Sequence, residues 1–107
     1  MHMQERQGPI APEVVRQIKR TIRDAMEPFG LKSVEVWAGE DHDGDPVIFI
    51  EGQYDLSEKP LELGITGQVA SVVRELVRNA GETRFPHIRH KFHEKQMVAK
   101  PDRRARA

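Results

Sequence analysis

The sequence lacks cysteine and long apolar runs, and it carries no net charge. Without cysteine there can be no disulfide bond, no thiol nucleophile and no thiolate metal site. No stretch approaches the roughly 18 consecutive apolar residues that indicate a membrane span, so we expect no membrane partner. The start shows no charged segment followed by an apolar one, so we expect no secretory signal. Together these absences favour the reducing cytoplasm as the location.

Motifs for catalysis and for small-molecule binding are also absent. No serine or threonine sits in a nucleophile elbow, and no Gly-Lys-Ser/Thr triplet follows a strand as in a phosphate-binding loop. The carboxylates of residues 40–58 are expected to be solvated, which does not favour acid–base catalysis. We therefore predict that the protein is not an enzyme, needs no cofactor and has no small-molecule substrate.

What is present is a chain of 107 residues, long enough for one domain with its own core. The charge is unevenly spread. Residues 31–63 carry two basic and nine acidic side chains, whereas residues 64–107 carry ten basic and four acidic ones. This division indicates an acidic face and a basic end, which a solvated surface or a charged partner would explain. The domain boundaries we predict are a flexible arm over 1–11, one domain over 12–92 and a basic disordered tail over 93–107, with residues 1–2 resembling a cloning scar.

Apolar periodicity predicts two helices and two strands. Apolar residues recur at helical spacing over 12–27 and again over 66–80. Residues 31–38 alternate and residues 47–52 are densely apolar, as expected of strands. The turn signal Asp43-Gly44 between the strands predicts an antiparallel hairpin.

Two segments are ambiguous. Ser57 could cap a short helix, and the following helix could begin near Pro60 and run through the glycines with a kink. Residues 83–92 fit a helical face or an edge strand, and we favour the strand. The fold class is α+β, in the order α-β-β-α(-β), with two helices on one face of an antiparallel hairpin or three-stranded sheet. The expected core is Val15, Ile18, Ile22, Val34, Val36, Phe49, Val69, Val72, Val73 and Leu76.

Two clusters suggest metal ligands, and neither predicts a metal site. The alternating aspartates of residues 41–45 lack the glycine and glutamate that a calcium loop requires at its sixth and twelfth positions. Three histidines are spaced by three residues and would share one face of a helix, whereas a strand would divide them between its faces. The aspartates are Asp41, Asp43 and Asp45, and the histidines are His87, His90 and His93.

A Gly-x-x-Gly sequence at Gly64–Gly67 suggests RNA binding. The order helix, strand, strand, short helix, Gly-x-x-Gly, helix, strand resembles a type II KH domain. That resemblance implies that the loop clamps single-stranded RNA. Phosphate contacts would come from Arg16, Arg20 and Arg23, or from the basic tail. The alternative is a glycine-softened helix start packed on the hairpin.

Residues 12–92 also resemble a group of short bacterial proteins with an αββα build. The matching segments are the acidic hairpin Glu40-Asp41-His42-Asp43-Gly44-Asp45-Pro46-Val47, the segment Leu63-Gly64-Ile65, and the block Gly81-Glu82-Thr83-Arg84-Phe85-Pro86. Proteins of that group look like companions of HEPN-type proteins in two-gene, toxin–antitoxin-like arrangements. The resemblance implies a protein partner and assigns no site residue.

The function we predict is a non-catalytic module that binds another protein or a second copy of itself. A small sheet has edges that must be covered, and a second chain can cover them. Trp37 alternates with Val36, so Trp37 lies on the open sheet face if Val36 faces the helices. Segment 53–63 could instead shield the tryptophan. The expected partner contacts are Trp37, Arg84 and Phe85.

Overall fold

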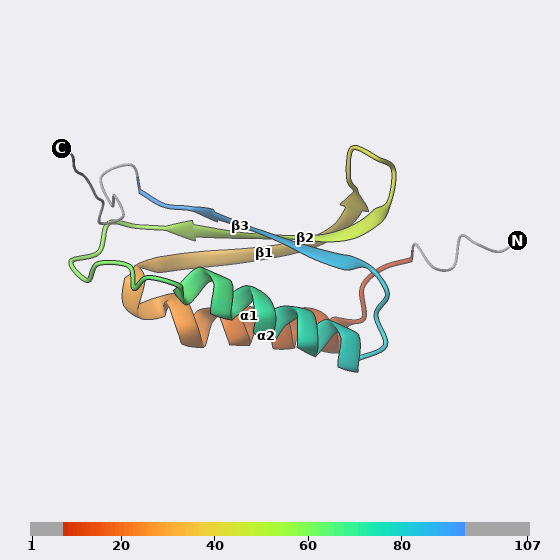
Figure 1. The fold of residues 1–107 in the computed structure, drawn as a ribbon, viewed down its shortest axis with the longest axis horizontal. Coiled ribbons are helices and arrows are strands. Elements are labelled where there is room, and N and C mark those ends of the chain that lie inside the picture. The colour runs from red at the N-terminus through yellow and green to blue at the C-terminus, as the bar shows by residue number, and fades with distance from the viewer. Residues whose placement is uncertain (1–7, 94–107) are drawn as a thin grey trace, which may run out of the picture.

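The computed structural model describes residues 8–93, which form two helices and a three-stranded sheet in the order α-β-β-α-β. Both helices cover the same face of the sheet, and the opposite face carries no other described element (Figure 1). The predicted α+β fold class is confirmed. The elements are α1 Pro12–Met26, the 3₁₀ helix η2 Glu27–Phe29, β1 Leu31–Glu40, β2 Pro46–Tyr54, α2 Ile65–Asn79 and β3 Phe85–Lys91.

The sheet has the strand order β1-β2-β3 and is mixed. Strands β1 and β2 form the predicted antiparallel hairpin, in which Trp37 pairs with Phe49. Strand β3 is the predicted edge strand, but it runs parallel to β2, with His87 beside Phe49. The prediction of an antiparallel sheet is therefore wrong for β3. Helix α2 lies between β2 and β3 in the chain. It returns the chain to the end of the sheet where β2 begins, so that β3 can run parallel to β2.

Helix α1 follows its predicted bounds closely. Pro12 occupies its first turn, where a missing N–H costs nothing, and Glu13 lies at the positive end of the helix dipole. The helix buries every fourth residue against the sheet and α2. The chain then turns through η2 into β1 at Gly30, whose φ of 93° is left-handed. The buried residues of α1 are Val14, Ile18, Ile22 and Met26.

Helix α2 covers the periodic stretch predicted over 66–80 and does not extend back toward Pro60. Its first residue is Ile65, and Gly64 immediately before it has a φ of 84°, a left-handed conformation that cannot continue a helix toward Pro60. Residues 55–62 contain no helix, so neither alternative for this segment is present: Ser57 caps no short helix, and no kinked helix starts near Pro60. Gly67 lies in the first turn of a regular helix.

The core lies between the helices and one face of the sheet. Ile18, Ile22, Val34, Val69 and Val73 are buried as predicted, whereas Val15, Val36 and Leu76 are only partly buried. Two predicted core residues lie elsewhere. The first is Val72, which is 52% exposed on the outer side of α2. The second is Phe49, because its neighbours Ile48 and Ile50 take the helix-facing positions and alternation directs Phe49 to the opposite face.

The ends of the predicted domain are partly described. Ile10 packs against the core, and the carbonyl of Gly8 accepts a hydrogen bond from Arg84, so residues 8–11 of the expected arm contact the domain. Residues 1–7, and the expected tail from residue 94 onward, lie outside the described part of the chain. No helix within residues 8–93 is both long and apolar enough to cross a membrane.

Candidate interaction surfaces

The uncovered face of the sheet carries a row of rings that crosses all three strands. Trp37 on β1 lies 5.6 Å from Phe49 on β2, measured between ring centroids. Phe49 lies 6.0 Å from His87 on β3, and His87 lies 5.4 Å from Phe85. We call these four residues the aromatic row. Alternation brings them together, because paired residues of adjacent strands point to the same face.

Both ends of the aromatic row are accessible to solvent. Trp37 is 39% exposed and Phe85 is 52% exposed. Trp37 therefore lies on the open face, as its alternation with Val36 predicts, and segment 53–63 does not shield it fully. Gly39 fixes the centre of the row, because a Cβ at this position would lie only 2.7 Å from the Phe49 ring. One edge of the ring therefore lies close to Gly39.

Charged side chains flank the aromatic row on the same face. Glu51 on β2 pairs with Arg89 on β3, with the carboxylate oxygen and the guanidinium nitrogen 3.1 Å apart. The same guanidinium lies 5.9 Å from the centroid of the Phe49 ring. Glu35 is paired with Glu51 in the strand register and adds a second carboxylate. The face is thus aromatic at its centre and carries both signs of charge beside it.

Arg84 does not share this surface. It is 6% exposed, and its Nε lies 3.3 Å from a carboxylate oxygen of Glu82, which also accepts the backbone N–H of Arg84 at 3.0 Å. A second guanidinium nitrogen donates a hydrogen bond to the carbonyl of Gly8. The structure therefore places this predicted partner contact inside the domain, where it joins the N-terminal segment to the start of β3.

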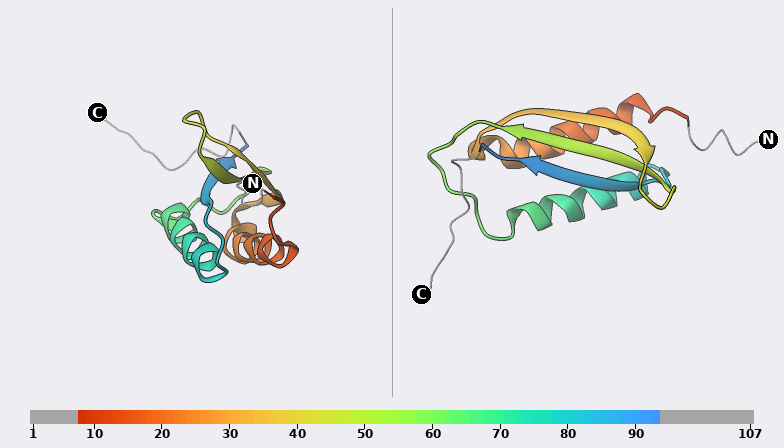
Figure 2. Two further views of the ribbon diagram at one scale, coloured as in Figure 1. Left: turned by 90° about the vertical axis from the view of Figure 1, so that its right-hand side faces the viewer. Right: turned by 90° about the horizontal axis from the view of Figure 1, so that it is seen from above.

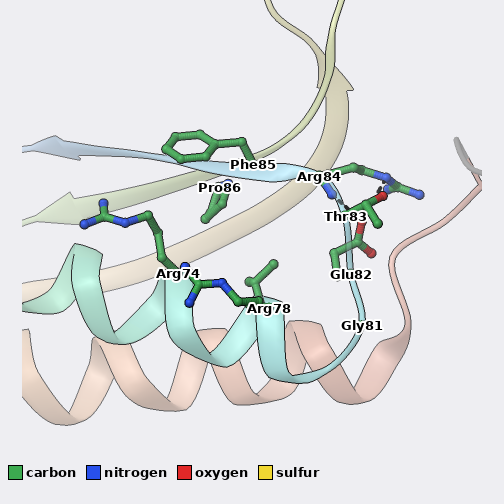
Figure 3. Close-up of a pocket in the computed structure, with 9 residues that line it drawn as sticks. Arg74, Arg78, Gly81, Glu82, Thr83, Arg84, Phe85 and Pro86 are labelled. Carbon is green, nitrogen blue, oxygen red and sulfur yellow. Dashed lines mark hydrogen bonds and ion pairs between the residues drawn. The ribbon is translucent and has the colours of Figure 1, made fainter.

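A groove of about 430 Å³ lies between α2 and β3 (Figure 3). Arg74 and Arg78 project from α2 on one side of it, while Phe85 and Pro86 line the β3 side. Val77 contributes an apolar wall, and Glu82 lies just after the C-terminal end of α2. The sequence predictions included Phe85 and missed the two arginines, although their spacing of four residues places them on one helical face.

The acidic hairpin loop is held by its own backbone. One carboxylate oxygen of Asp41 accepts the N–H groups of Asp43 and Asp45, each at 2.9 Å. The hydrogen bond from Asp45 is the main cause that holds the pKa of Asp41 below its usual range. Carboxylate oxygens of the three aspartates lie within 4.8 Å of one another. Turn formation explains this cluster, as the sequence indicates.

The three spaced histidines do not converge. His87 and His90 lie on β3, where alternation directs His87 to the open face and His90 to the helix side, as the strand alternative predicts. His93 lies beyond the end of β3. The aspartate cluster is the only group of three or more potential metal ligands within the described residues 8–93.

A partly buried polar contact that the sequence predictions missed lies on the helix side of the sheet. The hydroxyl of Tyr54 lies 2.7 Å from Nδ1 of His90, and the Phe92 ring lies 4.4 Å from that of Tyr54. Burial raises the pKa of Tyr54 above its usual range and lowers that of His90. Both shifts favour the neutral forms, which suits a hydrogen bond inside the fold. Because Tyr54 and His90 are 36 residues apart in the chain, no local sequence pattern indicates that they are in contact.

The residues predicted for RNA contact do not all lie together. Gly64 and Gly67 lie at the start of α2. Helices α1 and α2 run in opposite directions (Figure 1), so Arg23 in the last turn of α1 lies at the same end of the layer. Arg16 lies near the other end, where it forms an ion pair with Glu13. The structure thus gathers part of the predicted set at one end and separates the rest.

Comparison of the chain with protein families, curated proteins and solved structures finds no match.

Proposed function

We propose that this protein is a non-catalytic interaction module that binds another protein through the open face of its sheet. The observation that carries the proposal is the aromatic row of Trp37, Phe49, His87 and Phe85 on a face that no other described element covers. Aromatic side chains at the centre of a patch are typical anchors of protein interfaces. Burying the exposed parts of Trp37 and Phe85 removes apolar area from water, which favours association.

The surroundings of the row favour a protein partner over RNA. Aromatic rings on a sheet can stack unpaired bases, but such sites also need a basic surface for the phosphates. Here Glu35 and Glu51 lie on the same face, and Arg89 is already paired with Glu51. A protein surface can match this mixture of aromatic rings and charges of both signs, whereas the carboxylates repel a polyanion such as RNA. RNA binding through Gly64–Gly67 is the alternative proposal, and the test below separates the two.

The resemblance to companions of HEPN-type proteins suggests which partner to test first. We propose that the chain acts as the antitoxin-like member of a two-gene system. Its partner would then be the product of the neighbouring gene. Co-expression of the two chains, followed by size-exclusion chromatography with light scattering, should yield a complex containing both.

Substitutions on the open face should weaken that complex selectively. We expect Trp37→Ala or Phe85→Ala to lower the affinity about tenfold or more, the loss typical of an interface anchor. Leu63→Ala is the matched control, because Leu63 is an exposed apolar residue outside the sheet. The proposal fails if the complex forms unchanged with both open-face variants. It also fails if the protein binds single-stranded RNA, and Gly67→Asp abolishes that binding while Trp37→Ala does not.

A further inference from the structure

The groove beside β3 contains two arginines without a carboxylate partner among residues 8–93. Arg74 and Arg78 are four residues apart on α2, so their like charges face each other along the helix. Arg74 donates a weak hydrogen bond to Ser71 Oγ at 3.4 Å, and none of the ion pairs in this part of the chain includes either arginine. Glu82 also lines the groove but is held by Arg84. The groove therefore presents positive charge beside Pro86, while the ring of Phe85 lies on the other side of β3 (Figure 3).

The hairpin loop presents the opposite charge in a preformed shape. Four carboxylates lie within six residues, at Glu40, Asp41, Asp43 and Asp45. No ion pair within residues 8–93 includes them. Besides the two hydrogen bonds to the Asp41 carboxylate, the backbone N–H of Asp41 donates to the carbonyl of Asp45 at 3.0 Å, and that of Gly44 donates to the carbonyl of Asp41 at 2.9 Å. A loop fixed in this way loses little conformational entropy on binding.

The acidic loop and the basic groove lie at the same end of the molecule. The hairpin rises from the sheet at the end where α2 finishes and β3 begins, as two perpendicular views show (Figures 1 and 2). This placement matters for symmetry. When two complementary patches lie at one end, a two-fold axis can bring each against its counterpart on a second copy, which gives a closed dimer and no filament.

We propose that two copies of this chain form a symmetric dimer in which the acidic hairpin of each copy docks into the Arg74/Arg78 groove of the other. The carboxylates of residues 40–45 would pair with the two guanidinium groups of the groove. The groove lies on the helix side of β3 and the aromatic row on its other side, so a different protein can still bind the open face. The inference therefore does not rest on the proposed function.

The dimer should be weak and sensitive to salt. The contact consists of residues 40–45 of one copy and a shallow groove of the other, which places it at the small end of specific interfaces. Its charges lie near the rim, where ions screen them. We expect the full chain to shift from monomer to dimer as its concentration rises in about 0.05 M salt, and to return to monomer in about 1 M salt.

A charge exchange tests the pairing of the two patches. One variant carries Arg74→Glu and Arg78→Glu, and the other carries Asp43→Lys and Asp45→Lys. In sedimentation equilibrium, each variant alone should dimerise about tenfold more weakly, because like charges then oppose each other. An equal mixture should form a mixed dimer with an affinity within about threefold of the original, because both contacts are complementary again. Asp41 is left unchanged because its carboxylate holds the loop.

A matched control separates specific pairing from a change in total charge. Arg20→Glu with Arg23→Glu alters the charge of exposed helix residues by the same amount on α1, away from the groove, and should leave dimerisation unchanged. Three results would overturn the proposal: a monomer at every concentration in low salt, a dimer that both charge variants retain, or a mixture that stays monomeric. A dimer that Trp37→Ala abolishes and the charge variants retain would assign self-association to the open face instead.

Discussion

The two faces of the sheet are built from the same strands but from different side chains. The centre of the helix-facing side is aliphatic and closed, with Ile48 and Ile50 almost completely buried. The open side is aromatic and accessible, with Trp37 and Phe85 at its ends. Neighbouring residues in one strand therefore serve two purposes. Those that face the helices hold the fold together, and we propose that those that face outward bind a partner.

The largest difference between the faces should appear in truncations on β2. Ile48→Ala should lower the free energy of unfolding by about 2–5 kcal/mol, because it leaves a cavity beneath two helices. Phe49→Ala removes a larger side chain from the open face and should cost only about 1 kcal/mol. Chemical denaturation of both variants measures the difference. Equal losses would show that the open face is as tightly packed as the core.

A smaller difference should appear when a methyl group is added to each face. A Cβ on Gly52 would lie 3.1 Å from the Tyr54 ring and 3.2 Å from a methyl group of Leu31, both buried. Gly52→Ala should therefore cost about 1–3 kcal/mol through overpacking. In Gly39→Ala the new Cβ would lie 2.7 Å from the Phe49 ring, but that ring can move toward solvent. We therefore expect the free energy of unfolding to fall by less than about 1 kcal/mol. The comparison fails if Gly39→Ala is the more costly change in thermal or chemical unfolding.

His90, which is partly buried, should make stability depend on pH. Burial lowers the pKa of His90 in the folded state, so below about pH 6.5 the unfolded chain takes up the proton first. The stability that neutral His90 provides is full above that pH and declines as the pH falls further. Denaturation midpoints measured between neutral and acidic pH should show this decline. The slope should flatten in His90→Gln and persist in His87→Gln, and a slope that His90→Gln leaves unchanged would contradict the assignment.

The smallest effect on stability should come from the residue with the largest proposed effect on binding. Trp37→Ala should change the free energy of unfolding by no more than about 1 kcal/mol, because part of the indole is already in water. A loss of several kcal/mol would show that Trp37 belongs to the core, and its weakened binding would then report unfolding. Circular dichroism during chemical denaturation provides the measurement.

Alternation and turn chemistry predicted most elements of the fold. The helix over 12–27, the hairpin around Asp43-Gly44 and the edge strand near Ile88 are all confirmed. The face of each residue on β2 was harder to predict. Four successive apolar residues, Val47 to Ile50, contain no polar residue that marks the solvent side, so the pattern allowed Phe49 in the core.

Long-range contacts explain the remaining errors. Side-chain periodicity carries no information on strand direction, although the helix between β2 and β3 is a signal that favours a parallel pair. Arg84 is buried because Glu82 and the carbonyl of Gly8 surround its guanidinium, and Gly8 is 76 residues distant in the chain. The groove likewise forms only when α2 packs beside β3. Alternation predicted that Trp37 is exposed, but sequence patterns could not place Arg74 and Arg78 in a groove beside β3.

The binding role of the open face is the central claim, and Trp37 allows a direct measurement because it is the only tryptophan in the chain. Incorporation of 5-fluorotryptophan gives a single ¹⁹F resonance from this protein, whatever the partner contains. The product of the neighbouring gene is purified without the label and added to the labelled protein. The resonance should then move and lose its sensitivity to exchange of H₂O for D₂O, because the indole leaves water. If light scattering shows a stable complex while the resonance and its solvent sensitivity remain those of the free protein, the partner binds elsewhere and the claim is wrong.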